Sequence, residues 1–487
     1  MNCIHKEHLI SKIGEMYKDI LIHPEYKTYE VSPIQLNLDN RIDIIIKLIC
    51  IPQIVDNAHF NSSYLENLYK EHIKCMTQGS FKEVGSDSKH NFELFKSEFK
   101  DICLSISNNG FNENISLIPV TSDLTPINGA HRVAAALYYG VNIKIVIIPE
   151  IKSVNYGLSF FRKYYLDERF INSAIIKLFE ISNKYVLGVT WPASNISPEM
   201  LIKSFPNNII DIKTNTLTRE GCHNIVCEAY SVETWLGSAD NNYNGAWGKV
   251  IPCLGDNSSP ANFFILKLNE TDNIINLKES LRTKIGIGKH SIHICDDNID
   301  SLPLLKYIYN INFEKIVNNS HYKYTSLLKN IESFRSYVNK NNIKKTDIIF
   351  DSSALLGVLG LREPRDLDYL SFDNKNIPNA DWHIDYLKYH NDKLIDILLD
   401  PQNHIYIYGF KFISPSAFKA FKKNRNEKKD RIDLTLLSSF EDKSKLYFLK
   451  AKIGSKYLFF KYKIRVKLIK LIDLLGIKSY LKKILRK

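Results

Sequence analysis

The chain has 487 residues, of which 44% are hydrophobic and 24% are charged. This ordinary mixture excludes a disordered chain, a fibrous rod and a small disulfide-stapled module, and the length predicts several domains. The eight cysteines include no CxxC pair, and residues 1–10 do not form an apolar signal peptide. Both features favour reduced thiols in a cytoplasm.

Residues 1–150 form the first predicted domain, which mixes helices and strands. Hydrophobic periodicity predicts helices over residues 8–21, 41–49, 92–108 and 128–139, and strands over residues 28–31, 115–119 and 143–148. Residues 151–184 are predicted to form a connecting helix.

A middle α/β domain is predicted over residues 185–330. It opens with a strand over residues 185–190, and Gly- and Asn-rich turns follow around residues 237–248. A helix over 277–284, a strand over 291–295 and a helix over 302–310 complete it. A zinc site is not predicted at Cys222, His223, Cys227 and Cys253, because the spacing of four-ligand structural zinc sites is absent.

A third domain covers residues 331–442, and the fold class is therefore mixed α/β and α+β, with several domains. Residues 443–487 form a basic tail with fifteen Lys or Arg and a single acid, Asp473, whereas the net charge of the whole chain is +12. The rest of the chain is thus nearly neutral.

In the tail, lysines alternate with apolar residues at helical spacing. The apolar residues are Leu468, Leu471, Ile472 and Leu475. This pattern predicts an amphipathic helix on an anionic membrane surface, because the apolar runs are far shorter than the roughly 20 residues that span a bilayer. The alternatives are a helix docked on the protein with a solvated basic face, and binding to RNA or DNA.

The first motif, residues 126–136, combines a Gly at a turn with a helix start and two basic side chains. Its candidate phosphate-binding residues are Asn128, Gly129, His131 and Arg132. Exposed backbone N–H groups at a helix start favour an anion, and His and Arg add side-chain donors. The alternative is an ordinary helix start whose Arg pairs with an acid.

This stretch resembles the nucleotide-binding box of the ParB/sulfiredoxin-like superfamily, with residues 29–34 and 40–43 as the first box. The resemblance implies a ParB/sulfiredoxin-like fold in which Arg41 helps to bind ATP, ADP or CTP. Ala130 stands where sulfiredoxin has its catalytic cysteine, and no basic helix-turn-helix follows, so a kinase is the activity that remains.

A kinase needs a carboxylate that accepts the proton of the substrate hydroxyl and helps to hold Mg²⁺. Asp43 is the first candidate, because it lies in the first box beside Arg41. Asp39 is the second, and weaker candidates are Glu30 and the pair Glu71-His72. The alternative for each is a solvated surface acid.

The second motif spans residues 348–370 and ends in Asp366-Leu367-Asp368. Strand alternation places Asp366 and Asp368 on one side, with Leu367 facing the core. Two carboxylates in this arrangement can share divalent cations that support phosphoryl displacement. The alternative is the solvated face of a strand.

This motif resembles the polymerase-β-type nucleotidyltransferase superfamily. The resemblance implies that Ser352 and Ser353 contact a triphosphate, that Asp366 and Asp368 bind Mg²⁺ or Mn²⁺, and that a later strand supplies a third carboxylate. Asp385 fits this third position best, with Asp381 second.

One residue departs from that pattern, since Asp351 stands in place of the usual Gly. A carboxylate beside a triphosphate repels it unless a cation intervenes, which predicts weak nucleotide binding or an inactive domain. Basic residues between 422 and 431 supply cations for phosphate, unless they form a salt-bridged helix.

The chain as a whole is similar to proteins encoded among bacterial capsule and O-antigen genes. The residues that carry this similarity are 290–294 and 389–392. The combined resemblances imply a phosphotransferase of surface-polysaccharide biosynthesis. It would phosphorylate a sugar or polyol, or transfer a nucleotidyl group to it or to a lipid-linked glycan. The expected location is cytoplasmic, on the inner face of the bacterial inner membrane.

Two other functions stay open. A glycosyltransferase that uses a nucleotide-sugar on a lipid-linked glycan would also use an Asp-x-Asp motif and a basic tail. An RNA- or DNA-directed nucleotidyltransferase or regulator is disfavoured, because the nearly neutral body of the chain lacks the expected basic surface.

Overall fold

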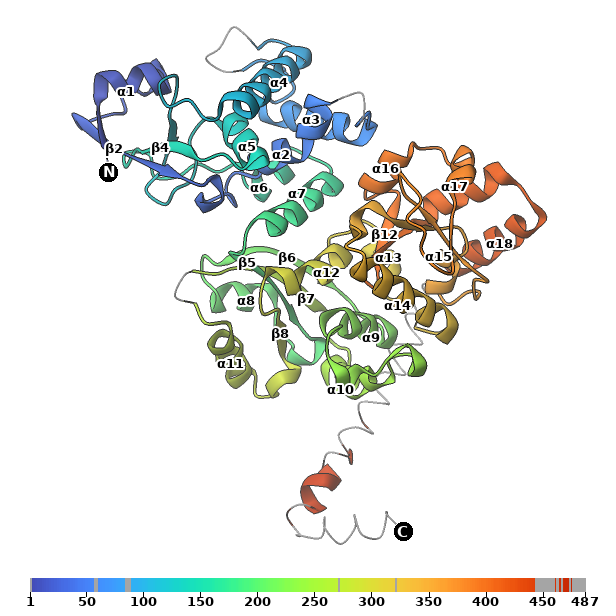
Figure 1. The fold of residues 1–487 in the computed structure, drawn as a ribbon. Helices are drawn as coiled ribbons and strands as arrows, with labels where there is room; N and C mark the ends of the chain where they lie inside the picture. The colour runs from blue at the N-terminus through green and yellow to red at the C-terminus, as the bar shows by residue number, and fades with distance from the viewer. Residues whose placement is uncertain are drawn as a thin grey trace. The chain divides into compact units, whose positions relative to one another are not determined.

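The computed structural model describes residues 2–56, 60–83, 89–269, 272–319 and 322–442, and residues 460, 464–465, 467–472 and 474. The chain divides into two compact units (Figure 1). Unit 1 contains residues 1–183 and 392–401, and unit 2 contains residues 184–391 and 402–487. The mixed α/β, multidomain fold class predicted from the sequence is confirmed.

The division differs from the predicted one in two respects. The predicted middle and third domains belong to one unit, and residues 392–401 join unit 1. There α16 (Leu394–Leu399) packs against α3 (Ser63–Met76). Asp396 accepts hydrogen bonds from the Ser62 hydroxyl at 2.5 Å and from the Tyr64 amide at 3.1 Å, at the start of α3. A carboxylate at this end of a helix stabilises it.

Unit 1 is built on a four-stranded sheet. Its order is β1 (Asn2–His5), β2 (Glu25–Val31), β4 (Ile143–Ile147), β3 (Ile118–Val120), in which only β3 and β4 pair in parallel. α1 (Lys6–Ile13) covers a core cluster with Tyr17, Tyr26 and Val146. The predicted helix over residues 8–21 is therefore wrong at both ends, because α1 starts at Lys6, directly after β1, and stops before Gly14.

The remaining helices of unit 1 surround α2 (Ile42–Val55), which is buried along almost its whole length. A helix that is buried on all sides needs partners on all sides. Its partners are α3, α4 (Phe92–Asn109), α5 (Ala130–Tyr139) and α7 (Glu168–Ile181). The predicted connecting helix is in fact two helices of unit 1, α6 (Leu158–Lys163) and α7.

The first sheet of unit 2 has the order β6 (Ile209–Asn215), β7 (Ala261–Lys267), β5 (Tyr185–Thr190), β8 (Ile292–Ile294). All neighbours are antiparallel, which is the split β-α-β arrangement. α8 (Pro198–Ser204) and α11 (Ile274–Ile285) pack on one face over a core that includes Ile292 and Ile294. Figure 1 shows α9 (Arg219–Ala229) and α12 (Asn298–Ile308) on the other side, while α10 (Trp247–Leu254) packs against α9.

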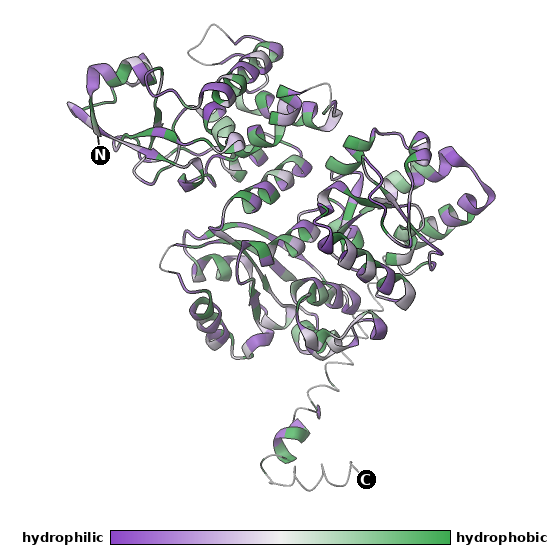
Figure 2. Ribbon diagram, in the orientation of Figure 1, coloured by the Kyte–Doolittle hydropathy of each residue, from purple (hydrophilic) through white to green (hydrophobic). Residues whose placement is uncertain are grey.

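The second sheet of unit 2 holds the nucleotidyltransferase-like motif. Its order is β11 (Ala380–Trp382), β10 (Leu367–Leu370), β9 (Ile349–Asp351), β13 (Phe410–Ile413), β12 (His404–Ile407). On one face, Phe334 of α14 (Thr325–Lys340) contacts the rings of Phe350 and Phe410. The helix ribbons in Figure 2 alternate between hydrophobic and hydrophilic stretches, as expected of helices that bury one side.

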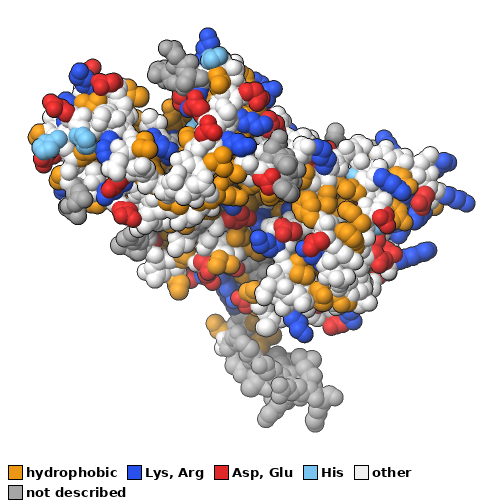
Figure 3. Space-filling view, turned by 45° about the horizontal axis from the view of Figure 1, so that its top comes forward, with side chains coloured by type: hydrophobic (Ala, Val, Ile, Leu, Met, Phe, Trp, Pro, Cys, Tyr) orange, Lys and Arg blue, Asp and Glu red, His pale blue; other side chains and the backbone are white. Residues whose placement is uncertain are grey.

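Most of the predicted basic tail lies outside the described residues. The described ones are helical, and the following apolar side chains among them are exposed: Phe460, Ile464, Leu468, Ile469, Leu471 and Leu474. A search of the described part of the chain finds no helix with the length and apolarity to cross a bilayer. Figure 3 shows basic and acidic side chains interspersed on the face in view.

Candidate active site

Three aspartates meet on one face of the second sheet of unit 2. In the strand register, Asp368 lies opposite Asp351 on β9 and opposite Asp381 on β11. Asp366 precedes Asp368 by two residues and shares its side of the chain. Asp366, Asp368 and Asp381 each place one carboxylate oxygen within 4.8 Å of the others. Oxygen ligands at this separation fit a divalent cation such as Mg²⁺ or Mn²⁺.

The strand sequence explains this placement. Leu367 and Tyr369 of β10 are buried, and Tyr369 lies beside Phe334 of α14, on the face opposite the aspartates. The alternation predicted from the sequence is therefore present. It exposes Asp366 and leaves Asp368 half-buried.

The third carboxylate of the group is Asp381, the second choice from the sequence. Asp385, the first choice, lies in the 3-10 helix η9 (Ile384–Tyr389) and is not a member of the group. The physical reason is the parallel pairing of β10 with β11, which sets Asp381 directly beside Asp368. This register is fixed by long-range strand pairing and cannot be counted along the chain.

The aspartates line a cavity of about 600 Å³, a size typical of small-molecule sites. Ser352 and Ser353 line it as well, as the resemblance to nucleotidyltransferases implied. The cavity also has a basic side, which consists of Arg362, Arg365, Lys422, Arg425 and Lys429.

Two buried acids hold most of these cations in place. The Lys422 ammonium lies 3.0 Å from Asp430 and 3.1 Å from Asp433. Arg425 pairs with Asp430 at 2.6 Å, and Arg362 pairs with Asp433 at 3.0 Å. Burial alone would raise the pKa of Asp430, but hydrogen bonds from Arg425 and Lys422 lower it to about 2. The salt-bridged alternative for residues 422–431 is therefore present, and it orients cations at the cavity wall.

Asp351, which departs from the Gly of the nucleotidyltransferase pattern that the motif resembles, is buried and bonded to two imidazoles. Its Oδ2 lies 2.7 Å from Nδ1 of His383 and 3.3 Å from Nε2 of His390. Burial alone would raise the pKa of Asp351, but these bonds hold it below its usual range. The predicted repulsion of a triphosphate is weakened accordingly, because the carboxylate already interacts with two potential cations. No spacing in the sequence indicates this pairing.

Asp368 lies among charges of both signs. Burial raises its pKa, His383 lowers it in part, and the neighbouring carboxylates of Asp366 and Asp351 raise it again. A divalent cation relieves this repulsion. Ser352 is close enough to hydrogen-bond Asp368, and it adopts φ +53°, a left-handed conformation that is uncommon outside Gly. Such backbone strain is concentrated at functional sites.

In unit 1 the two predicted boxes lie together, but their charges are paired internally. Arg41 donates to both oxygens of Asp43, at 2.8 and 2.9 Å, and to the carbonyl of Pro126. Lys47 adds a contact to Asp43 at 3.4 Å. Arg41 is 3% exposed and Asp43 is 1% exposed. A general base must reach the substrate proton, so this geometry supports a structural role for Asp43 over the predicted catalytic one.

The second box presents its residues in two directions. Gly129 adopts φ +81°, and a Cβ there would lie 2.6 Å from Ile118, so only Gly fits. The guanidinium of Arg132 lies near Gly129. His131 instead packs on the ring of Phe99 at 4.7 Å, with Nε2 3.2 Å from the Tyr69 hydroxyl. Consecutive helix residues point about 100° apart, which is why His131 and Arg132 diverge.

Arg132 differs from Arg41 in its partners. In the described ranges of unit 1, no carboxylate lies within ion-pair distance of its guanidinium. Burial lowers the pKa of Arg132, and its electrostatic neighbour is the buried Tyr17. Asn128, Gly129 and Arg132 therefore remain candidates for anion binding, whereas His131 belongs to the packing of the unit.

The weaker acidic candidates of unit 1 lie elsewhere. Glu71 pairs with Lys74 at 3.0 Å, and Glu30 accepts a hydrogen bond from Asn142 at 3.3 Å. His72 is buried, 3.5 Å from Lys47. Asp39 precedes Arg41 in the loop before α2. Among the described residues, none of these belongs to a cluster of carboxylates like the one in unit 2.

Comparisons with protein-family models, with curated proteins and with solved structures found no match. The resemblances therefore depend on the sequence motifs alone.

Proposed function

We propose that unit 2 is a nucleotidyltransferase that uses Mg²⁺ or Mn²⁺ and a nucleoside triphosphate. The observation that supports this most strongly is the group formed by Asp366, Asp368 and Asp381 at the cation-lined cavity. Bound divalent cations would supply charge neutralisation for the phosphates and would activate the attacking oxygen. Carboxylates that repel one another when no cation is bound are suited to hold them.

The chain's own residues then have distinct tasks. Asp366, Asp368 and Asp381 orient the cations, and Ser352 and Ser353 contact the triphosphate. Arg362, Arg365 and Lys422 line the same cavity and bind the negatively charged phosphates. Because Asp433 holds both Arg362 and Lys422, these donors are positioned before the nucleotide arrives.

The acceptor that we propose is a hydroxyl of a sugar, a polyol or a lipid-linked glycan in capsule or O-antigen biosynthesis. The choice of acceptor depends on the similarity of the whole chain to proteins encoded among capsule and O-antigen genes. The basic, apolar tail supports a peripheral location on the cytoplasmic face of the bacterial inner membrane, because both of its components favour an anionic bilayer surface.

A second function is proposed for unit 1, in which Asn128, Gly129 and Arg132 bind the phosphates of a nucleotide for a kinase reaction. The observation that favours it is the guanidinium of Arg132, which has no described acidic partner beside a left-handed Gly at a helix start. Asp43 is left out of this proposal as a base, because Arg41 and Lys47 already neutralise it.

The two reactions release different products. Nucleotidyl transfer releases pyrophosphate, whereas kinase activity releases a nucleoside diphosphate. The full chain is incubated with ATP or CTP, Mg²⁺ or Mn²⁺, and a panel of sugars and polyols, and both products are measured. Asp366→Asn should lower pyrophosphate release by at least about a hundredfold, since residues that only orient a metal ligand already contribute 10- to 100-fold.

The matched control is Asp373→Asn, the same change at an exposed position of the same unit. It should leave the rate unchanged, and both variants should melt like the wild type. Normal pyrophosphate release by Asp366→Asn would contradict the proposal. Turnover of a nucleotide-sugar in place of the triphosphate would support the glycosyltransferase instead.

A further inference from the structure

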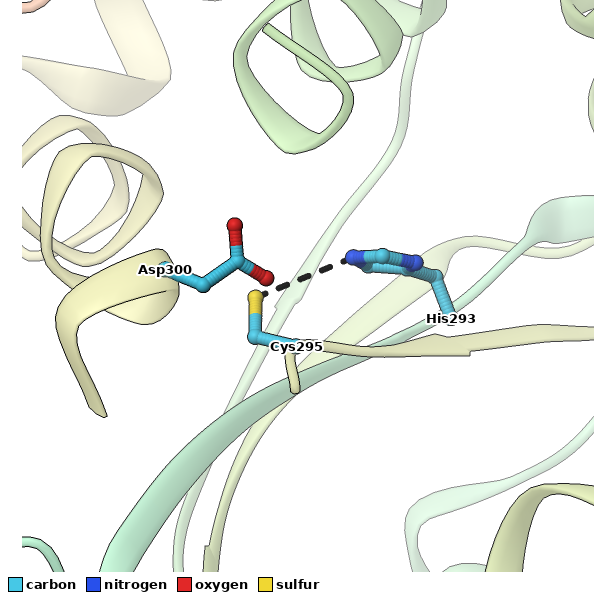
Figure 4. A group of neighbouring side chains, drawn as sticks. All are labelled: His293, Cys295 and Asp300. Atoms are coloured by element: carbon cyan, nitrogen blue, oxygen red, sulfur yellow. Dashed lines mark hydrogen bonds between the residues drawn. The ribbon is translucent and has the colours of Figure 1, made fainter. Parts of the chain in front are cut away.

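A second cluster of possible metal ligands lies in unit 2, away from the aspartate cavity. His293 of β8 and Cys295, just beyond it, point to the same side of the strand, because they are two residues apart. Asp300 comes from the first turn of α12 (Figure 4). One donor atom of each residue lies within 4.8 Å of the other two.

The separation of the donors fits zinc. A tetrahedral ion with bonds of about 2.3 Å to sulfur and about 2.0–2.1 Å to nitrogen places these two ligands about 3.6 Å apart. Sγ of Cys295 lies 3.7 Å from Nε2 of His293. Imidazole, thiolate and carboxylate together select zinc over Mg²⁺ or Ca²⁺, which prefer oxygen ligands alone.

The three ligands are held by the surrounding structure. The amide of Cys295 donates to the carbonyl of Leu187 on β5 at 2.9 Å, and the ring of His293 packs on Tyr230 at 4.5 Å. Asp300 accepts a hydrogen bond from the amide of Asp296 at 3.1 Å. A metal ion would therefore meet ligands that need little rearrangement.

The cluster opens on a cavity. His293 and Asp300 line a space of about 520 Å³ that four basic side chains also line: Lys249, Lys278, Arg282 and Lys289. Lys278 pairs with Asp296 at 2.7 Å and Arg282 with Glu279 at 2.7 Å, and both acids are exposed. Three protein ligands leave one position of a tetrahedral zinc ion open, as in catalytic sites.

We propose that His293, Cys295 and Asp300 bind one zinc ion, whose open position takes an oxygen of a phosphorylated ligand held by Lys249, Arg282 and Lys289. Zinc binding displaces the thiol proton of Cys295, which passes to the solvent as the Zn–S bond forms. This site is separate from the nucleotidyltransferase site and does not depend on that proposal.

Two other pairs of a cysteine and a histidine in unit 2 provide a comparison for this cluster of three possible ligands. Cys227 lies 3.7 Å from His223, and Cys253 lies 3.8 Å from His290, each without a third donor at the same distance. The two groups of three donors found in the described ranges are this one and the aspartates, and only this one contains sulfur and nitrogen. Cys253 therefore offers a matched control.

Zinc binding is tested on the full chain, which is first treated with a chelator and then supplied with zinc. Native mass spectrometry should show one zinc per chain in the wild type and in Cys253→Ser. Cys295→Ser, Asp300→Asn and His293→Ala should each bind zinc at least about tenfold more weakly, and retained circular dichroism shows that they fold. With Co²⁺ in place of zinc, thiolate-to-metal absorption should appear in the wild type and vanish in Cys295→Ser.

Equal zinc affinity in the wild type and all three variants would overturn the site, as would a wild type that binds no zinc. Asp366→Asn should keep the zinc, which separates this result from a failure of the nucleotidyltransferase proposal. Inorganic phosphate should change the spectrum of bound Co²⁺, and Arg282→Gln should weaken that effect. An unchanged cobalt spectrum at saturating phosphate would overturn the phosphate part alone.

Discussion

Unit 1 and unit 2 both gather acidic and basic side chains near a predicted phosphate site, but they arrange them differently. In unit 1, Arg41, Asp43 and Lys47 are buried, and both cations pair with the carboxylate of Asp43. In unit 2, Asp366, Asp368 and Asp381 line one cavity, and three of the cations that also line it pair with Asp430 and Asp433 instead. Buried opposite charges stabilise one another, whereas like charges that meet at a cavity repel one another unless a cation lies between them.

The largest effect is expected from breaking the buried pair of unit 1. Asp43→Ala leaves Arg41 and Lys47 without their counter-ion and should destabilise unit 1 by about 3–5 kcal/mol. Hydrogen exchange of the full chain measures this, through faster exchange of the amides of α2. Asp19→Ala, the same change at an exposed position, should have no effect. Unchanged protection of α2 combined with loss of a kinase activity would restore Asp43 as a catalytic base.

The next effect distinguishes the two candidates for the third carboxylate of unit 2. Asp381→Asn should weaken Mn²⁺ binding by about tenfold or more, whereas Asp385→Asn should change it less than about twofold, since only Asp381 joins the group. Electron paramagnetic resonance of free Mn²⁺ gives both affinities. The reverse order would show that β11 does not pair with β10 in this register when metal is bound.

A smaller effect is expected at the second box of unit 1. Arg132→Ala should weaken nucleotide binding there by about tenfold, because a hydrogen bond to a charged group contributes roughly 1.5–3 kcal/mol. Asp366→Asn is used as the background, so that binding by unit 2 does not interfere. Lys70→Ala, which removes an exposed cation of the same unit, is the control. Equal affinity of both variants would exclude the box as a nucleotide site.

The smallest effect concerns acid stability at the cavity wall of unit 2. The pKa of Asp430 falls from its ordinary value of 3.8 to about 2 in the folded chain. The contribution of the Asp430 carboxylate to the free energy of unfolding is therefore complete above about pH 4 and is lost as the pH falls towards 2. Thermal melting should show that Asp430→Asn destabilises the chain at pH 6 and that the difference from the wild type shrinks near pH 2. A constant difference would mean that Asp430 is not ionised in the fold.

Much of the fold followed from local patterns. Periodicity predicted α4 to within one residue and β5 exactly, because each has a regular apolar pattern along its length. The helix α3 had no matching prediction, and α6 and α7 were merged into one. The candidate site was predicted in part: the strand pattern placed Asp366 and Asp368 together, but the choice between Asp381 and Asp385 depended on strand pairing.

The sequence by itself determined the features that depend on near neighbours along the chain. These are the shared side of Asp366 and Asp368 and the concentration of positive charge in residues 443–487. Only the tertiary structure decided the contacts between distant residues: Arg41 with the Pro126 carbonyl, and Asp351 with His383 and His390. The reason is that alternation and helical periodicity act over a few residues, whereas the partner of a buried charge is selected by packing between elements far apart in the chain.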